Sequence, residues 1–349
     1  SLGENSTQEF ALSETGATLT EVVVGARKGT PPAGKGGSET FIGRDKMARI
    51  PSVGRNISDY LSYTPQVKVT GDGGVSIAGQ NNRYNSFYID GALNNDVFGL
   101  AASGTNGGQA NIPPISIDAI DQFQVIISPY DASIGNFTGG GVNAITKSGT
   151  NDFKGSVWYV YRNQDMAGKS PVAIPKAGSP GTLERLRLNK FTSQNKGFSI
   201  GGPLIKNKLF FFLLGETRKD ERPQPFNIGD YRGTATLDSI AKLANFLKSQ
   251  YQYDPGDFLN NPELVNADWI TAKLDWNINS NHRLSLSHRY NKGERYNTSS
   301  SSSTIINFFS NGYIFPTKSN STSAELRSTF NKGASNRLLL TLSKVLDDR

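Results

Sequence analysis

The sequence predicts a mainly β protein, in which an α/β domain precedes part of an antiparallel transmembrane β-barrel. Three observations support this fold class. After Thr150, apolar and polar residues alternate in segments of about ten residues, the length of a tilted membrane strand. The connections between these segments are alternately short and long, and the residues before Thr150 show no sustained alternation. With 349 residues, the chain is long enough for two such units.

The composition excludes a helical membrane protein. Hydrophobic residues make up 36% of the chain, and the mean hydropathy is −0.43. The longest apolar stretch, Leu209 to Leu214, is far too short to cross a bilayer as a helix. Barrel strands are apolar only at every second residue, so they give an average hydropathy close to that of a soluble protein. A membrane β-barrel is therefore compatible with this composition.

Residues 1–37 are expected to form a tail, a short β-favouring segment and a linker. Glu21, Val22, Val23 and Val24 favour extended structure, and an ordinary edge strand is one interpretation of them. The linker is rich in glycine, proline and lysine, so it should be flexible. Its Gly29 to Lys35 segment has the glycine and lysine spacing of a phosphate-binding loop, but glycine replaces the serine or threonine that would bind Mg²⁺.

Residues 38–150 are expected to form the α/β domain. Asp90 and Gly91 are the residue types of a tight hairpin turn. The polar residues Asn94 to Asp96 and Ser103 to Gln109 predict a long loop after this turn. Further along, Gly139 to Gly141 should allow the chain to turn tightly and to pack closely against a barrel wall, because glycine has no side chain.

Residues 151–349 are expected to supply about seven barrel strands. From Ile270 to Ile278 every second residue is apolar, and the residues between them are polar or charged. We therefore expect Leu274 and Trp276 to face lipid and Lys273 to face the interior. A helix is predicted from Leu237 to Gln250, inside one of the long connections.

The lengths of the connections favour a barrel over a soluble β-sandwich. Short turns are expected at 203–208, 279–281 and 331–336, and long connections at 165–190, 221–266 and 292–320. Outer-membrane barrels have short turns on the periplasmic side and long loops outside. A sandwich would also show alternation, but its loops need not sort by length in this way.

No pattern typical of an enzyme or a cofactor site is found, so no catalytic residues, cofactor or metal site are expected. The chain contains no cysteine, which excludes disulfides and thiolate chemistry. His282 and His288 lie six residues apart on one strand face, which favours a place in the wall over metal binding. The net charge of +7 is spread along the chain without a basic run, so no nucleic-acid partner is expected.

Several ordered motifs occur between Gly54 and Lys147. They are Arg55-Asn56, Thr64-Pro65, Val75 to Gly79, Phe87 to Gly91 with Asp90 and Gly91, Ser128 to Tyr130, and Gly139-Gly140-Gly141-Val142-Asn143. This arrangement resembles the plug domain of TonB-dependent outer-membrane transporters. The segment from Asn143 to Asn151 is similar to the Oar-like and SusC-like branch of that family.

The resemblance implies a plug inside a barrel of about 22 strands in the outer membrane of a Gram-negative bacterium, with the plug and N-terminus toward the periplasm. It implies active import of a solute, glycan or peptide, energised by the inner-membrane protein TonB. Glu21 to Val24 would be the TonB box, and Asn94, Asn95 and Asp96 would face the substrate, although a solvated loop is the alternative. A surface lipoprotein lid is a possible further partner. The alternative function is that of an outer-membrane β-barrel protein captured as a structural component or client of an assembly or secretion complex.

Overall fold

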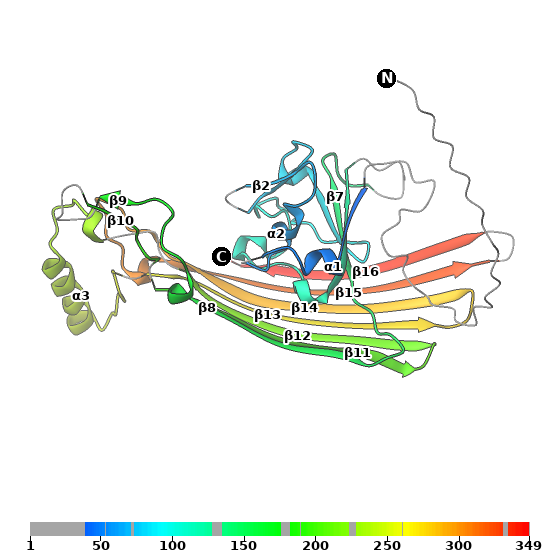
Figure 1. Cartoon of the computed structure of the whole chain (residues 1–349). Helices are drawn as coiled ribbons and strands as arrows, with labels where there is room; N and C mark the ends of the chain where they lie inside the picture. The colour runs from blue at the N-terminus through cyan, green and yellow to red at the C-terminus, as the bar shows by residue number, and fades with distance from the viewer. Residues whose placement is uncertain are drawn as a thin grey trace, which may run out of the picture.

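The computed structural model describes residues 39–52, 54–70, 73–127, 135–175, 182–188, 190–222, 228–259, 261–330 and 334–348. These residues form a long curved sheet, here called the wall, and a smaller domain, residues 39–146, on its concave side (Figure 1). We call the smaller unit the inner domain. The predicted segments Glu21 to Val24 and Ser128 to Tyr130 lie outside the described residues.

The inner domain is built on a five-stranded sheet. Its order is β1 (Glu39–Gly43), β6 (Ile120–Ile126), β7 (Gly141–Thr146), β4 (Ser86–Ile89) and β5 (Ala92–Leu93). The β4–β7 pair is parallel and the other pairs are antiparallel. The remaining elements are α1 (Arg44–Met47), α2 (Ile57–Leu61), the hairpin of β2 (Val67–Val69) and β3 (Val75–Ile77), and the 3₁₀ turns η1 (Asn82–Tyr84), η2 (Gly108–Ala110) and η3 (Ile117–Ala119).

The core of the inner domain continues onto the wall. Leu61, Ile77 and Phe123 are among its fully buried side chains. Phe212 and Leu214 of the wall belong to the same cluster of buried residues. The wall and the inner domain therefore share one apolar core, which fixes the domain against the sheet.

The wall contains seven antiparallel strands and does not close, which confirms the predicted fold class. From one edge to the other the strands are β16 (Ser335–Asp347), β15 (Tyr313–Thr329), β14 (His282–Asn297), β13 (Glu263–Asn277), β12 (Leu209–Arg222), β11 (Thr192–Ile205) and β8 (Lys154–Asn163). Leu274 and Trp276 lie on the convex face, about 40% exposed, whereas Lys273 is buried toward the inner domain. The predicted alternation is confirmed on this strand.

Strand β13 begins at Glu263, several residues before the predicted start near Ile270. The alternation of polar and apolar residues reverses at Trp269. In the part of the strand before Trp269, the buried residues Val265 and Ala267 are apolar, and the outward residues Asn266 and Asp268 are polar. The reversal arises because the inner face of this end packs against apolar residues of the inner domain, Ala110 and Ile112, whereas Lys273 meets the polar Thr146 and Asp90. The long connections before β13 and after β14 are correspondingly shorter than predicted, since β13 begins at Glu263 and β14 extends to Asn297.

The connections sort by length to the two ends of the wall. The predicted helix is confirmed as α3 (Leu237–Tyr251), and it lies with the small hairpin of β9 (Ile174–Pro175) and β10 (Leu183–Glu184) beyond the end that carries the long connections (Figure 1). The other 3₁₀ turns are η4 (Gln164–Met166), η5 (Ile228–Asp230) and η6 (Phe309–Asn311). Among the helices of the described residues, none has the length and apolar character that crossing a membrane requires.

Candidate functional site

The turn between β4 and β5 connects the inner domain to the wall. Asp90 and Gly91 both have positive φ, 51° and 82°, as a tight hairpin turn requires. The Asp90 carboxylate accepts hydrogen bonds from the backbone N and the Oγ1 of Thr146, at 2.9 and 2.7 Å. The Gly91 N donates to Asn143 Oδ1 at 3.1 Å. The structure thus brings three predicted site residues together where β4 meets β7.

Lys273 extends this junction to the wall. Its Nζ donates to Thr146 Oγ1 at 2.9 Å and lies 3.8 Å from the Asp90 carboxylate. Lys273 is 9% exposed, and the neighbouring Arg289 is 3% exposed and interacts electrostatically with Asp90. The partly buried Asp90 carboxylate is therefore balanced by two buried cations of the wall.

Of the three consecutive glycines, Gly140 shows most clearly why glycine is needed. A Cβ at this position would lie 2.5 Å from Cγ2 of the buried Ile77. The close approach is therefore to the core of the inner domain, and the expected packing of this triplet against the wall is wrong. Other glycines meet the wall: at Gly149 a Cβ would lie 2.4 Å from the Phe211 carbonyl oxygen, and at Gly91 it would lie 2.5 Å from the guanidinium of Arg337.

Arg55 and Asn56 lie in another part of the inner domain, at the start of α2. Arg55 has a φ of 51°, and its guanidinium pairs with the Asp118 carboxylate. The backbone N of Asn56 donates to the Asp59 carboxylate at 3.4 Å. In the same corner, burial and the nearby Arg44 lower the pKa of Lys147. The pair of Arg55 with Asp118 therefore joins the start of α2 to η3.

The polar segment Asn94 to Asp96 builds a loop. Asn95 Oδ1 accepts from Phe87 N at 2.7 Å, and the Asp96 carboxylate accepts from the backbone N of Leu100 at 2.7 Å and of Ala101 at 2.6 Å. Asn94 is buried, and its Oδ1 has no hydrogen-bond partner among the described residues. The side chains that the loop exposes are apolar: Val97, Phe98 and Leu100.

A second contact with the wall forms where this loop returns to η3. Four side chains of the wall donate hydrogen bonds to four backbone carbonyls within residues 109–114. We call this set of hydrogen bonds the carbonyl latch. The donors and acceptors are Arg295 to Gln109 (3.3 Å), Arg218 to Asn111 (2.9 Å), Trp269 to Pro113 (2.8 Å) and Asn291 to Pro114. The latch therefore spans β12, β13 and β14.

Further polar contacts orient the donors of the latch. The Arg218 guanidinium lies 5.4 Å from the centre of the Trp269 ring, in cation–π contact. Glu263 accepts from Arg295 at 2.6 Å and from Arg222 at 3.2 Å. Below the latch, Ser116 Oγ donates to the buried Glu216 carboxylate of β12. Beside these polar contacts, Ala110 and Ile112 of the inner domain pack with Val265, Ala267 and Phe315 of the wall, so polar and apolar contacts together hold the inner domain to this part of the wall.

The two contacts lie at different heights in the barrel. Asp90 and Lys273 lie toward the short turns, whereas Arg218, Arg295 and the 109–114 segment lie toward the long connections. In outer-membrane barrels the short turns are periplasmic and the long loops are external. The latch is therefore on the external side of the junction.

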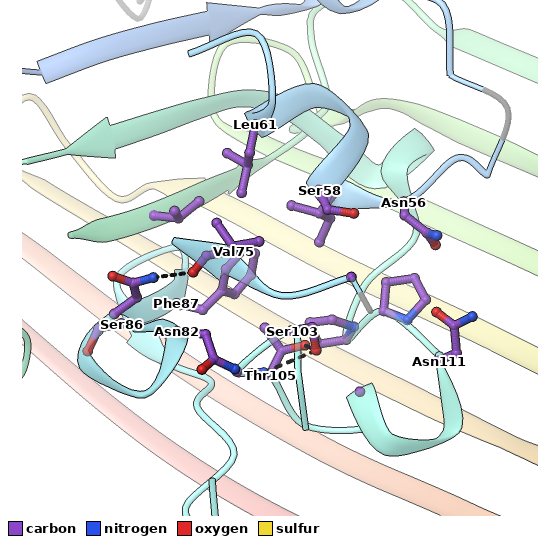
Figure 2. Close-up of a pocket in the computed structure, with 18 of the residues that line it drawn as sticks. Asn56, Ser58, Leu61, Val75, Asn82, Ser86, Phe87, Ser103, Thr105 and Asn111 are labelled. Carbon is purple, nitrogen blue, oxygen red and sulfur yellow. Dashed lines mark hydrogen bonds between the residues drawn. The ribbon is translucent and has the colours of Figure 1, made fainter. Parts of the chain in front are cut away.

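A cavity of about 110 Å³ separates α2 and β3 from the loop that carries the latch (Figure 2). Leu61, Val75 and Phe87 line it on one side, and Ser103 and Thr105 on the other. A space of this volume can hold several water molecules. The inner domain is therefore packed less closely between these two halves than within either of them.

The residues of the latch were missed by the sequence analysis. Backbone carbonyls carry no residue-type signal, and the donors Arg218, Asn291 and Arg295 look like ordinary polar positions of a barrel strand. The reversed alternation around Trp269 is the one sequence signal that marks this region. Within the described residues, no group of three or more His, Cys, Asp or Glu side chains could hold a metal ion.

Comparison with protein families gives two matches that together cover most of the chain. A model described as "Outer membrane beta barrel domain" matches residues 145–348. A model described as "TonB-dependent Receptor Plug Domain" matches residues 34–142. The division between them falls where the inner domain ends and the wall begins.

Two curated proteins are similar in sequence. The TonB-dependent transporter Oar of Myxococcus xanthus is 29% identical over 290 residues, which cover 74% of this chain and 24% of that protein. The probable TonB-dependent siderophore receptor PirA of Acinetobacter baumannii is 28% identical over 196 residues, or 52% of this chain and 23% of that protein. This chain therefore spans about a quarter of the length of these relatives.

Solved structures support the fold. The ferric enterobactin receptor PfeA of Pseudomonas aeruginosa has a TM-score of 0.60 at 18% identity, covering 88% of this chain and 40% of that one. The outer membrane transporter YddB of Escherichia coli has a TM-score of 0.61 at 16% identity, covering 88% and 39%. At these identities the likeness concerns the fold alone.

Proposed function

Because this chain belongs to the TonB-dependent outer-membrane transporter family, of which it carries the plug domain and the first barrel strands, we propose that it imports a solute, glycan or peptide with energy supplied through TonB. The protein is located in the outer membrane, and the inner domain is its plug. In this proposal the protein performs no chemistry on its cargo. The plug closes the barrel at rest and moves when it is pulled from the periplasm.

The observation that carries the proposal is the carbonyl latch. Its hydrogen bonds run from wall side chains to the backbone of a single plug segment, residues 109–114. Water can replace such bonds when the segment moves, so the net free energy is only about 1 kcal/mol for each neutral donor and roughly 2 kcal/mol for each of the two guanidinium donors. The latch is therefore a contact that water can take over when the segment moves, whereas the apolar contacts of the plug with Leu214 and Val265 must separate as well if the whole plug moves.

The cavity supports a movement of part of the plug. It lies between the α2–β3 half and the loop that carries the latch. We propose that these halves separate here when the plug is pulled. Asn94, Asn95 and Asp96 would then act in substrate recognition by shaping the loop, since their polar groups are used within it or are buried. The exposed tip at Val97 and Phe98 would make the contacts.

The proposed connection to TonB is Glu21 to Val24. An extended segment with a β-favouring sequence can pair with a strand of a partner. The glycine- and proline-rich residues that follow would allow this segment to reach the partner while the plug stays in place.

A cross-link between plug and wall tests the proposal. Ser116 and Glu216 would be replaced by cysteine in the full-length protein and joined by a short, reducible bis-thiol reagent, since their side chains are hydrogen-bonded in the structure. Cells that express this variant should lose import of the cargo that co-purifies with the wild-type protein, and a reducing agent should restore it. Binding of the cargo should persist throughout.

The control joins two positions of the wall alone. Cysteines at Ser287 and Ser323, whose hydroxyls are 2.7 Å apart on neighbouring strands, should accept the same reagent without loss of import. Normal import by the cross-linked Ser116–Glu216 variant would show that this plug does not move away from β12 during transport.

A further inference from the structure

Three arginines lie side by side on one face of the wall, close to its short turns. Arg283 pairs directly with Arg327, and Arg327 with Arg337, on the neighbouring strands β14, β15 and β16. Residues that pair directly across antiparallel strands point to the same face of the sheet. We call these three residues the arginine row.

Contacts with the plug show that the row faces inward. A Cβ at Gly91 would lie 2.5 Å from the Arg337 guanidinium, so Arg337 reaches the turn between β4 and β5. Every second residue of a strand points to the same face, so Arg283 shares its face with Arg289. Arg289 interacts electrostatically with Asp90 of the plug. The row is therefore on the inner face of the wall.

The row lies at the periplasmic end of the wall. Strand β14 begins one residue before Arg283, and β16 begins two residues before Arg337. This end carries the short turns and lies opposite the end that carries α3 (Figure 1). Short turns are periplasmic in outer-membrane barrels. The turn between β11 and β12 adds the exposed Lys206 and Lys208, so this end of the wall attracts negative charge from the periplasm.

Two carboxylates balance the three arginines only in part. Glu325 accepts hydrogen bonds from Arg327, at 2.9 and 3.1 Å, and from Arg337. Asp275 lies 3.6 Å from the Arg283 guanidinium, which makes no hydrogen bond to a described residue. In chain order, the three arginine side chains are 42, 62 and 51% exposed. Directly paired like charges repel each other, so a further anionic group would stabilise the row.

The residues that precede the linker have the complementary charge. Residues 1–24 contain no lysine, arginine or histidine, and their four carboxylates are Glu4, Glu9, Glu14 and Glu21. Residues 25–38 can span about 45 Å when extended, which exceeds the roughly 30 Å diameter of a small domain. The chain is therefore long enough for residues 1–24 to reach the row from the start of the plug.

We propose that residues 1–24, here called the acidic segment, dock on the arginine row in the resting transporter. Its carboxylates would accept hydrogen bonds from guanidinium groups of the row, above all from Arg283. Membrane lipid does not reach the inner face, and an external cargo does not reach the row while the plug closes the barrel. The docked segment would hold Glu21 to Val24 at the mouth of the barrel. This inference rests on the proposed function, because it needs the acidic segment to lie in the periplasm.

The distance between two spin labels tests the docking. One label would replace Ser13 in the acidic segment and the other Ser280, which is exposed in the turn before β14, in the full-length protein with no other cysteine. Pulsed electron paramagnetic resonance should give a narrow distribution of short distances. The variant Arg283→Gln/Arg327→Gln should lower the ratio of docked to free segment about tenfold, which corresponds to about 1.4 kcal/mol for two exposed ion pairs.

A matched control separates the row from the general charge of this end. Lys206→Gln/Lys208→Gln removes the same charge at the same end but outside the row, and it should leave the distances unchanged. Glu9→Gln/Glu14→Gln alters the other partner without any change in the barrel, and it should free the segment as the arginine variant does. This second variant still tests the docking if the arginine variant does not fold.

Reversing the charge of both partners gives the strictest test. Arg283→Glu/Arg327→Glu should free the segment, and the further changes Glu9→Lys/Glu14→Lys should restore the narrow distribution. Broad distances in the wild type, unchanged distances in either neutralised variant, or an equal loss in the lysine control would each overturn the proposal. None of these measurements involves import, so absence of docking would leave the proposed transport intact, and failure of transport would appear only in the cross-linking experiment.

Discussion

Replacement of Trp269 by phenylalanine should loosen the carbonyl latch and leave the wall intact. Trp269 is 1% exposed, and its Nε1 donates to the Pro113 carbonyl at 2.8 Å. Phenylalanine keeps most of the apolar contact but leaves this carbonyl without its donor. It also weakens the contact with the Arg218 guanidinium, because the indole is the best ring for cation–π contact.

The expected cost is about 2 kcal/mol. A buried acceptor that loses its partner costs about 1 to 3 kcal/mol, and at roughly 1.4 kcal/mol for each factor of ten the latch should open about 30-fold more often. Hydrogen exchange of the Ala110 and Ile112 amides measures this opening, since both donate to the Gly107 carbonyl at 3.1 Å within the latched segment.

Trp276→Phe is the matched control, because Trp276 lies on the same strand but on the convex face, away from the plug. It should leave exchange of residues 109–114 unchanged. If Trp269→Phe exchanges at the wild-type rate, or if both variants accelerate exchange equally, the side-chain bonds to these carbonyls do not hold the plug.

Three other changes test separate parts of the molecule. Val23→Pro should abolish uptake but not ligand binding, because proline lacks the N–H needed for strand pairing; normal import at normal protein levels would place the TonB contact elsewhere. Spin labels at Leu274 and Lys273 should report lipid and a plug-side environment respectively, and the reverse order would refute the register of β13. Burial raises the pKa of the Tyr60 hydroxyl above its ordinary value of 10.0. As the pH rises, the hydroxyl therefore loses its proton in the unfolded plug before it does so in the folded plug, and the stability of the plug should fall above about pH 10. Tyr60→Phe should flatten this fall in urea titrations, and an unchanged slope would exclude Tyr60 as its cause.

Elements with a local signal could be predicted from the sequence. The Asp90-Gly91 turn follows from residue types that tolerate positive φ, and the alternation from Ile270 to Trp276 follows from lipid on one face and the plug on the other. Helix α3 has an apolar repeat and is within one residue of its predicted bounds. In each case, the residues that define the element are close together in the chain.

The candidate site was harder to predict from the sequence, because it depends on contacts between segments that are far apart in the chain. The latch joins residues 109–114 to side chains more than a hundred positions away, and its acceptors are backbone atoms. The start of β13 was predicted too late, because the apolar side chains of Val265 and Ala267 face the plug rather than lipid and so break the expected alternation. The roles proposed for Glu21 to Val24 and for Asn94 to Asp96 remain predictions.

The short link between plug and wall limits how a passage through the barrel can form. The plug ends at Thr146, and Gly149 already lies against the carbonyls of Gly202 and Phe211 in the wall. Three residues of extended chain span only about 10 Å. The end of the plug at Thr146 therefore cannot move far from the wall, and it can act as a pivot. Any opening wide enough for a cargo should therefore form on the side of the plug far from Thr146, by swinging rather than by expulsion of the whole domain.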